Sequence, residues 1–236
     1  MSEYEVFPNP PIVEAILTFS YPMLTDLEDL AKKFHSAVED NYPTFSPFHP
    51  EPSVPAKEPP SVRLISADGL NVISIGRRGF SYHRLRPYIA WDDFKGRARD
   101  AWDCFSRFSE PEEISGLALR YINRIDLPLG QDWARYLLMR PEIPDAIDTG
   151  IQQYLMVLHL QDLGVPATGT VAQVCEATPD PRVIALLLDI TVRTPPEARF
   201  FAQDAESVWE MIHRLRTYKD RLFFEGITEK TKDFFR

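Results

Sequence analysis

Residues 116–128, GLALRYINRIDLP, carry the clearest strand pattern in the chain and lie at its midpoint. Their side chains alternate between an apolar set and a second set that contains Arg120, Arg124 and Asp126. The apolar set is interrupted only by Asn123. An alternation with a period of two is typical of a strand that has one face on a hydrophobic core. We therefore predict a half-buried strand here and interpret the rest of the chain around it.

The segments on either side of this strand follow one order twice. Periodicity and turn residues predict a strand, a helix, three strands and a helix before it, and the same order from the central strand onward. The predicted elements before the central strand are 12–21, 26–40, 61–67, 70–76, 79–86 and 92–108. Those from it onward are 116–128, 132–139, 151–162, 168–177, 182–194 and 204–222.

This order predicts an α+β fold of two similar β-α-β-β-β-α halves, residues 1–115 and 116–236. Each half has a long helix with an apolar stripe, so we expect antiparallel sheets with helices on one face and the other face uncovered. The arrangement is analogous to the saddle of TATA-binding-protein-like folds. An analogy of architecture carries no function.

Local signals place the ends of several helices. Thr25 and Glu28 have the spacing of a capping box, and Asp92 can cap the second helix. Gly226 is suited to end the last helix, and Thr228 can cap a short turn after it.

Residues 41–60 contain seven prolines. Each proline removes a backbone donor and fixes φ, which disfavours both a helix and a central strand. We predict a long loop over the whole of this segment.

Composition limits the classes of partner. The formal net charge is −9, and the first sixty residues hold ten acidic but only three basic side chains. An acidic chain repels polyanions, so we do not expect nucleic acid as a partner. The sequence has no apolar run long enough for a membrane span and no leader pattern, so we expect a cytoplasmic protein that does not bind membranes. Two distant cysteines fit a reducing compartment.

Four segments, read together, resemble a known family. They are NPPIVEAILTF at 9–19, HRLRPYIAWDDF at 83–94, GLALRYINRIDLP at 116–128 and FFEGITEKTKDFF at 223–235. The chain is similar from end to end to a sporadically distributed family of uncharacterised prokaryotic proteins of about this length. The resemblance implies a prokaryotic origin, and it brings no activity, cofactor or catalytic residue.

Clustered cations suggest one candidate binding site. Arg77, Arg78, Arg84 and Arg86 fall within ten residues, and Arg120 and Arg124 lie on the polar side of the central strand. If these strands are neighbours, the six arginines could bind a phosphate, a carboxylate or an acidic protein. The alternative is a set of solvated arginines paired with nearby acids.

Glu14, Tyr121 and Asn123 are the polar groups that we expect to be partly buried, with Glu14 paired to Arg120 across strands. No metal, nucleotide or nucleophile motif is present, so the sequence assigns no catalytic residue, metal or cofactor. Two functions remain open. The favoured one is a binding or regulatory protein that engages a protein partner or a small anion through an open sheet face, and the alternative is an enzyme with a site assembled from distant residues.

Overall fold

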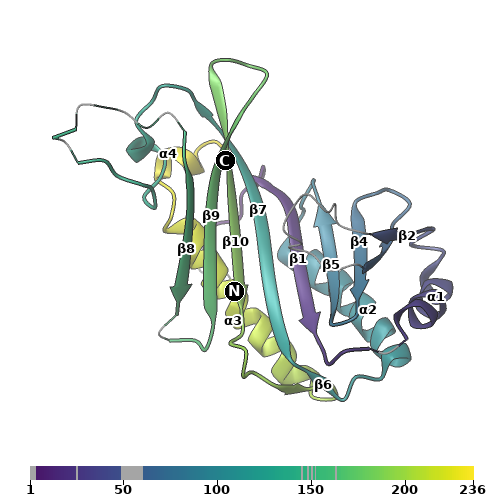
Figure 1. The fold of residues 1–236 in the computed structure, drawn as a ribbon. Coiled ribbons are helices and arrows are strands. Elements are labelled where there is room, and N and C mark those ends of the chain that lie inside the picture. The colour runs from purple at the N-terminus through teal and green to yellow at the C-terminus, as the bar shows by residue number, and fades with distance from the viewer. Residues whose placement is uncertain are drawn as a thin grey trace. The chain divides into compact units, whose positions relative to one another are not determined.

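The computed structural model describes residues 4–24, 26–48, 61–144, 146–147, 149, 151, 153–162 and 164–236. It is an α+β fold in which the paired strands run antiparallel, as the sequence predicts (Figure 1). The chain divides into two compact units. Unit 1 comprises Met1–Val13, Leu119–Arg193 and His213–Arg236, and unit 2 comprises Glu14–Ala118 and Thr194–Ile212.

Unit 2 contains a sheet whose strands follow the order β2-β3-β4-β5-β1. The strands are β1 (Ile12–Ser20), which belongs to unit 2 from Glu14 onward, β2 (Thr44–Phe48), β3 (Ser61–Ile65), β4 (Asn71–Gly76) and β5 (Gly79–Leu85). Helices α1 (Leu27–Val38) and α2 (Trp91–Ser109) pack on one face of it. The core between the layers is aromatic, and Phe19 stacks on Trp102 with ring centroids 4.2 Å apart. A second, small sheet pairs β6 (Glu113–Ile114) with β11 (Phe200–Phe201).

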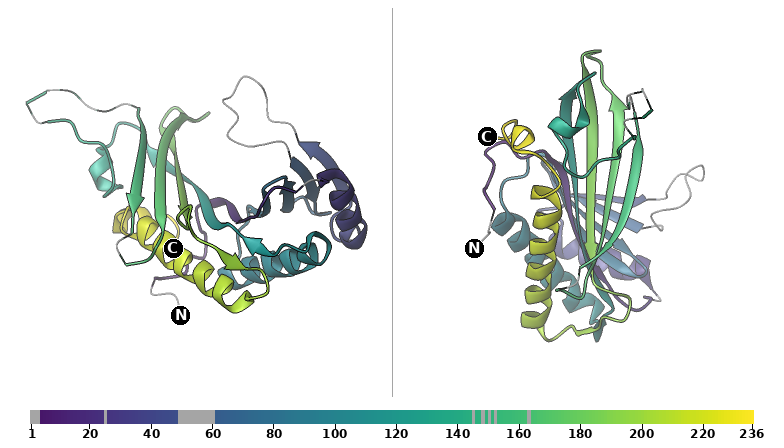
Figure 2. Two further views of the ribbon diagram at one scale, coloured as in Figure 1. Left: turned by 60° about the horizontal axis from the view of Figure 1, so that its bottom comes forward. Right: turned by 90° about the vertical axis from the view of Figure 1, so that its left-hand side faces the viewer.

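Unit 1 contains strands in the order β7-β10-β9-β8. The strands are β7 (Gly116–Pro128), which belongs to unit 1 from Leu119 onward, β8 (Leu155–Gln161), β9 (Thr168–Ala177) and β10 (Val183–Arg193). Helix α3 (Ala205–Phe224), which belongs to unit 1 from His213 onward, lies along one face of this sheet (Figure 2, right). The short helix α4 (Glu229–Lys232) follows it.

The predicted central strand is confirmed with its bounds and its two faces. In β7, Leu117, Leu119, Tyr121, Asn123, Ile125 and Leu127 are buried, and the alternate residues are not. The buried set is the apolar set of the sequence pattern, because those side chains face the core while Arg120, Arg124 and Asp126 face away from it.

Two helix caps differ from the predictions. The N-cap of α1 is Asp26, whose carboxylate accepts from the amide of Asp29, and Thr25 lies outside the described residues. Helix α2 begins one residue before Asp92, and its N-cap Ala90 makes no side-chain bond. Asp92 therefore lies in the first turn, where a carboxylate still interacts favourably with the helix dipole. The predicted cap at Thr228 is confirmed by the bond that its hydroxyl accepts from Thr231.

The predicted helix 132–139 is wrong. Only the 3-10 turn η1 (Trp133–Arg135) forms there, and Asp132 caps it. The following residues pair instead with the segment after α3, since Leu137 forms a β-bridge with Ile227. A backbone interaction distant in the sequence thus replaces the local helix.

The proline-rich loop is also shorter than predicted. Its described part contains β2, which pairs with β3, whereas residues 49–60 lie outside the described residues. Pro47 lies within β2, and this is possible because β2 is the last strand in the order of its sheet.

The strand order supports a comparison of the two predicted halves. In each, the first strand lies beside the last strand of a three-stranded meander, β1 beside β5 and β7 beside β10. The halves differ because the first adds β2 and the second has only η1 where α1 stands. The internal duplication and the saddle stay predictions. Among the described residues, no helix is long and apolar enough to cross a membrane.

Candidate functional site

The face of the unit 1 sheet opposite α3 exposes apolar side chains. The strand register places Leu155 of β8 beside Val174 of β9, and Val174 beside Leu187 of β10. Leu155 is 70% exposed, and Val157, the next residue on this face of β8, is 48% exposed. We call Leu155, Val157, Val174 and Leu187 the apolar row. It lies on a face that neither α3 nor α4 covers (Figure 2, right).

The apolar row ends at an ion pair. Val157 lies beside Ala172, which lies beside Asp189 in β10. Asp189 accepts three hydrogen bonds from Arg120, at 3.0 and 3.1 Å from Nε to its two oxygens and at 2.7 Å from Nη2 to Oδ2. An apolar centre with a polar rim is the usual composition of a protein-binding surface.

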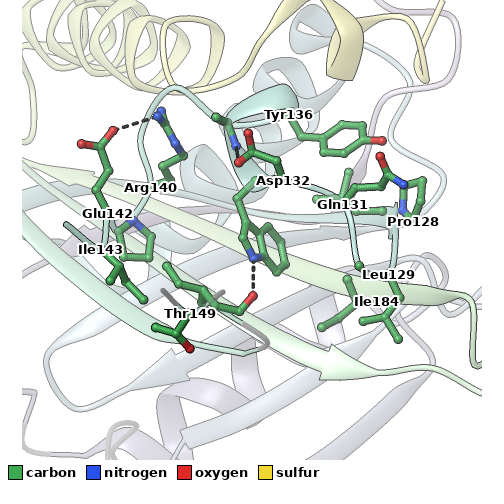
Figure 3. Close-up of a pocket in the computed structure, with 16 residues that line it drawn as sticks. Pro128, Leu129, Gln131, Asp132, Tyr136, Arg140, Glu142, Ile143, Thr149 and Ile184 are labelled. Atoms are coloured by element: carbon green, nitrogen blue, oxygen red, sulfur yellow. Dashed lines mark hydrogen bonds and ion pairs between the residues drawn. The ribbon is translucent and has the colours of Figure 1, made fainter. Parts of the chain in front are cut away.

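A pocket of about 980 Å³ lies at the end of the same sheet, beneath the segment that follows β7 (Figure 3). Its walls are apolar at Leu127, Leu129 and Ile184, and its polar groups include Asp132 and Arg140. The volume is within the range of small-molecule sites, which is roughly 300 to 1,000 Å³.

The polar groups of this pocket are engaged by the protein. Arg140 donates to Glu142 at 2.8 Å, and Asp132 accepts from the amide of Ala134 at 2.9 Å. Trp133 donates from Nε1 to the carbonyl of Ile151 at 3.0 Å, and this bond restrains the indole in the pocket lining. Two carboxylates and one guanidinium give the lining a net negative charge, so it does not suit an anion.

The structure does not gather the predicted arginines of unit 2 on one surface. Arg77 and Arg78 are exposed at one end of β5, and Arg86 is exposed beyond its other end. Arg84 is buried on the helix side of the sheet, where it donates to Asn71 at 3.1 Å and to the carbonyl of Pro87 at 3.2 Å. Burial and these bonds leave Arg84 unable to receive a ligand from solvent.

The two predicted arginines of unit 1 are both paired with acids. Arg120 is bound to Asp189, and Arg124 donates to Asp126 at 3.0 Å. A phosphate or carboxylate ligand would compete with these carboxylates for the two guanidinium groups. The arrangement therefore weakens the prediction of an anion site at Arg120 and Arg124.

Two of the three predicted buried polar residues are buried, and the third is part-buried. Asn123 donates to the carbonyl of Leu188 at 3.0 Å, which links β7 to β10. Tyr121 lies under the ammonium of Lys219, 4.1 Å from the ring centroid. The carboxylate of Glu14 is hydrogen-bonded to Nδ1 of His83 at 2.8 Å. The predicted Glu14–Arg120 pair would join the two units, and it stays a prediction.

Lys219 is a buried cation that sequence reasoning missed. It is bonded to Asp220, and Arg216 lies 3.4 Å from the same carboxylate. Burial lowers the pKa of the Lys219 ammonium, and the neighbouring Asp220 opposes this shift. None of these three residues lines the pocket, and the contact of Lys219 with Tyr121 joins α3 to β7.

The pocket also differs from the predicted enzyme site. Its lining includes none of Glu14, Arg120 and Tyr121. In the part of the chain that the structure describes, no group of three or more His, Cys, Asp or Glu side chains could hold a metal ion. The pocket was not predicted because its lining comes mainly from one irregular segment, whose conformation depends on distant contacts. The only local signal is the aromatic pair Trp133 and Tyr136.

Neither protein-family models nor curated proteins yielded a match to this chain. The family resemblance therefore stays a prediction.

Proposed function

We propose that the chain acts by binding a protein partner on the helix-free face of the unit 1 sheet. The observation that carries the proposal is the apolar row, in which Leu155 and Val157 are largely exposed next to the Arg120–Asp189 pair. Exposed apolar side chains that cluster within a polar rim lose their contact with water when a partner docks. The free energy gained by removing these side chains from water favours the docking of a protein surface of matching shape.

A small anion is a weaker candidate for this face. Its two arginines already bind carboxylates, and the exposed positions beside them are aliphatic. An anion would lose hydration and would compete with Asp126 and Asp189 for the two guanidinium groups. The surface thus fits an apolar protein patch better than a phosphate.

The test compares two variants of β8 that carry equal added charge on the same face. Leu155→Asp with Val157→Asp places carboxylates in the apolar row. His159→Asp with Gln161→Asp places them at the polar end of the strand, beside Thr170 and Thr168. Both positions of the control are exposed, so the folded state tolerates the control substitutions.

We expect at least a tenfold loss of affinity in the first variant and a change below threefold in the control. A partner is first isolated from an extract of the native host with the wild-type chain and purified. Its dissociation constant is then measured for all three proteins by calorimetry. Equal affinity for the two variants, or the absence of any saturable partner, would overturn the proposal.

The pocket supports a second candidate, a site for a small molecule. Its volume favours such a ligand, and its negative lining favours a neutral or cationic one. Benzylamine and benzoate are suitable probes because they share a ring and differ in charge. Benzylamine should shift the resonance of the Trp133 indole N–H and benzoate should not, and Asp132→Asn should reduce the shift because it retains the cap oxygen and removes the charge. No shift with either probe would exclude this candidate for such ligands.

A further inference from the structure

β8 is an edge strand without the usual protection. It is the last strand in the order of its sheet, and its sequence LMVLHLQ contains no charged residue and no proline. None of its seven residues is buried. Natural edge strands are usually protected by lysine, proline or a bulge, because their unpaired N–H and C=O groups can pair with another strand. The outer edge of β8 can therefore accept a further strand.

The hydrophobic core is also incomplete at β8. Met156, Leu158 and Leu160 lie on the α3 side of the sheet, beside the buried Gln173, Val171 and Gly169 of β9. These three side chains of β8 are nevertheless partly exposed. Helix α3 covers β9 at Gly169 through Tyr218 and Leu222. A strand added next to β8 would cover the apolar side chains that α3 leaves open.

The pattern of β8 is symmetric about Leu158. Residues 156, 158 and 160 on the core side are all apolar, so this side of the strand presents the same pattern when read in the reverse direction. We propose that β8 pairs antiparallel with β8 of a second copy of this chain. Leu158 then lies opposite Leu158 of the second copy, and Met156 lies opposite Leu160 of the second copy.

This register opposes only uncharged side chains on the other face of the strands as well. On the other face, Val157 lies opposite His159 of the second copy and Leu155 lies opposite Gln161 of the second copy. Although each copy carries a net charge of −9, β8 brings no charged side chain of either copy into the pairing. Directly opposed like charges would destabilise a strand pair, and here there are none. The proposal goes beyond the proposed function, since it uses the edge of the sheet and not its open face.

Charge exchange at the symmetric position tests the pairing. We expect the wild-type chain to have twice its monomer mass of 27.2 kDa in light scattering after size exclusion. Leu158→Lys and Leu158→Glu should each be monomeric, because two like charges meet on the twofold axis. An equal mixture of the two variants should regain the dimer mass. Circular dichroism melts check that both variants fold.

Cysteine crosslinking tests the register. Opposed Cα atoms in an antiparallel pair are about 4.5 to 5.5 Å apart, which a disulfide can span. Leu158→Cys in a Cys104→Ser background should therefore form a disulfide dimer. Leu155→Cys alone should not, since its copies would lie about 20 Å apart along the strands, but it should crosslink to Gln161→Cys in a mixture.

A wild-type chain that stays monomeric over the accessible concentrations would overturn the proposal. It would equally be overturned if Leu158→Lys remained a dimer or if Leu155→Cys crosslinked alone. Its failure can be distinguished from failure of the proposed function. A monomer that still binds its host partner through the apolar row would refute the dimer and support the open face, whereas a dimer without such a partner would do the opposite.

Discussion

The hydroxyl oxygen of Tyr218 lies 2.8 Å from the position that a Cβ atom would occupy at Gly169. Leu222 approaches the same position to 3.0 Å. The missing side chain in β9 thus lets α3 pack directly on the strand, and the residue at position 169 determines how closely helix and sheet approach.

Gly169→Ala is expected to lower the free energy of unfolding by about 1 to 3 kcal/mol, the usual range for overpacking a core. Urea denaturation measures the loss. Tyr218→Phe removes the closest atom and should recover part of it. Gly96→Ala is the matched control, because a Cβ at this position in α2 meets nothing within 4 Å. That substitution should stabilise by about 0.5 to 1 kcal/mol, since alanine is the better helix former.

Asn123 should tolerate an apolar substitute better than a charged one. Its amide donates to the carbonyls of Leu188 and Tyr121, so an aspartate would place a carboxylate against two acceptors in a buried site. We expect Asn123→Asp to cost at least about 3 kcal/mol, and Asn123→Leu about 1 to 2 kcal/mol for the lost hydrogen bond. Chemical denaturation at neutral pH gives the comparison. Equal losses would show that the site is open to water.

The Lys219–Asp220 pair should respond unequally to removal of its two members. Lys219→Met replaces a buried ammonium with an apolar side chain of similar length, and Asp220 keeps Arg216 at 3.4 Å. This change should alter the unfolding free energy by less than about 1 kcal/mol. Asp220→Ala leaves the buried cation without its carboxylate and should cost about 3 to 5 kcal/mol. The double variant should be more stable than Asp220→Ala alone, and thermal melts of all three proteins decide this.

Acid should release the C-terminal tail from the N-terminal segment. Arg236 donates to Glu5 at 2.6 Å and to Glu229 at 2.9 Å, and the amide of Asn9 donates to the carbonyl of Phe235 at 3.1 Å. Hydrogen bonds from Arg236 to Glu5, and from Lys232 and Arg236 to Glu229, lower the pKa of both carboxyls from the ordinary 4.5. A lowered folded-state pKa means that the stabilisation is present above pH 4.5 and is lost as the pH falls through the folded-state pKa.

Hydrogen exchange of the Asn9 amide reports this release. Its protection factor should fall in the wild type as the pH drops below 4.5, whereas Arg236→Ala should show low protection at every pH. Arg182→Ala serves as the control, because it removes another exposed pair, with Asp180, that does not touch the tail. A protection factor that stays constant down to pH 3 would contradict the prediction.

The sequence was sufficient where one local pattern controlled the structure. The alternation in 116–128 predicted β7 and its buried face, because side chains of a strand must point alternately to the two sides of a sheet. The bounds 168–177 were likewise predicted correctly, and the apolar stripe from Val208 to Leu222 predicted most of α3. In these segments the burial of apolar side chains and the local backbone preference favour the same secondary structure.

Local signals failed where a distant segment supplied the decisive contact. The segment 132–139 has helical composition, but the bridge between Leu137 and Ile227 satisfies its backbone and prevents a helix. Pro47 argued against a strand, but its position at the edge of a sheet removed the cost of the missing N–H.

For the candidate surfaces too, some features follow from the local sequence and others from distant contacts. The sequence by itself determined that β8 is apolar and uncharged, and that Arg120 and Arg124 lie on the polar side of β7. Only the tertiary structure decided that β8 is an edge strand, that Arg120 is bound to Asp189, and that Arg84 is buried. The physical reason is that residue type fixes what a side chain can bond to, whereas strand order fixes which groups come within reach and which remain open to a partner.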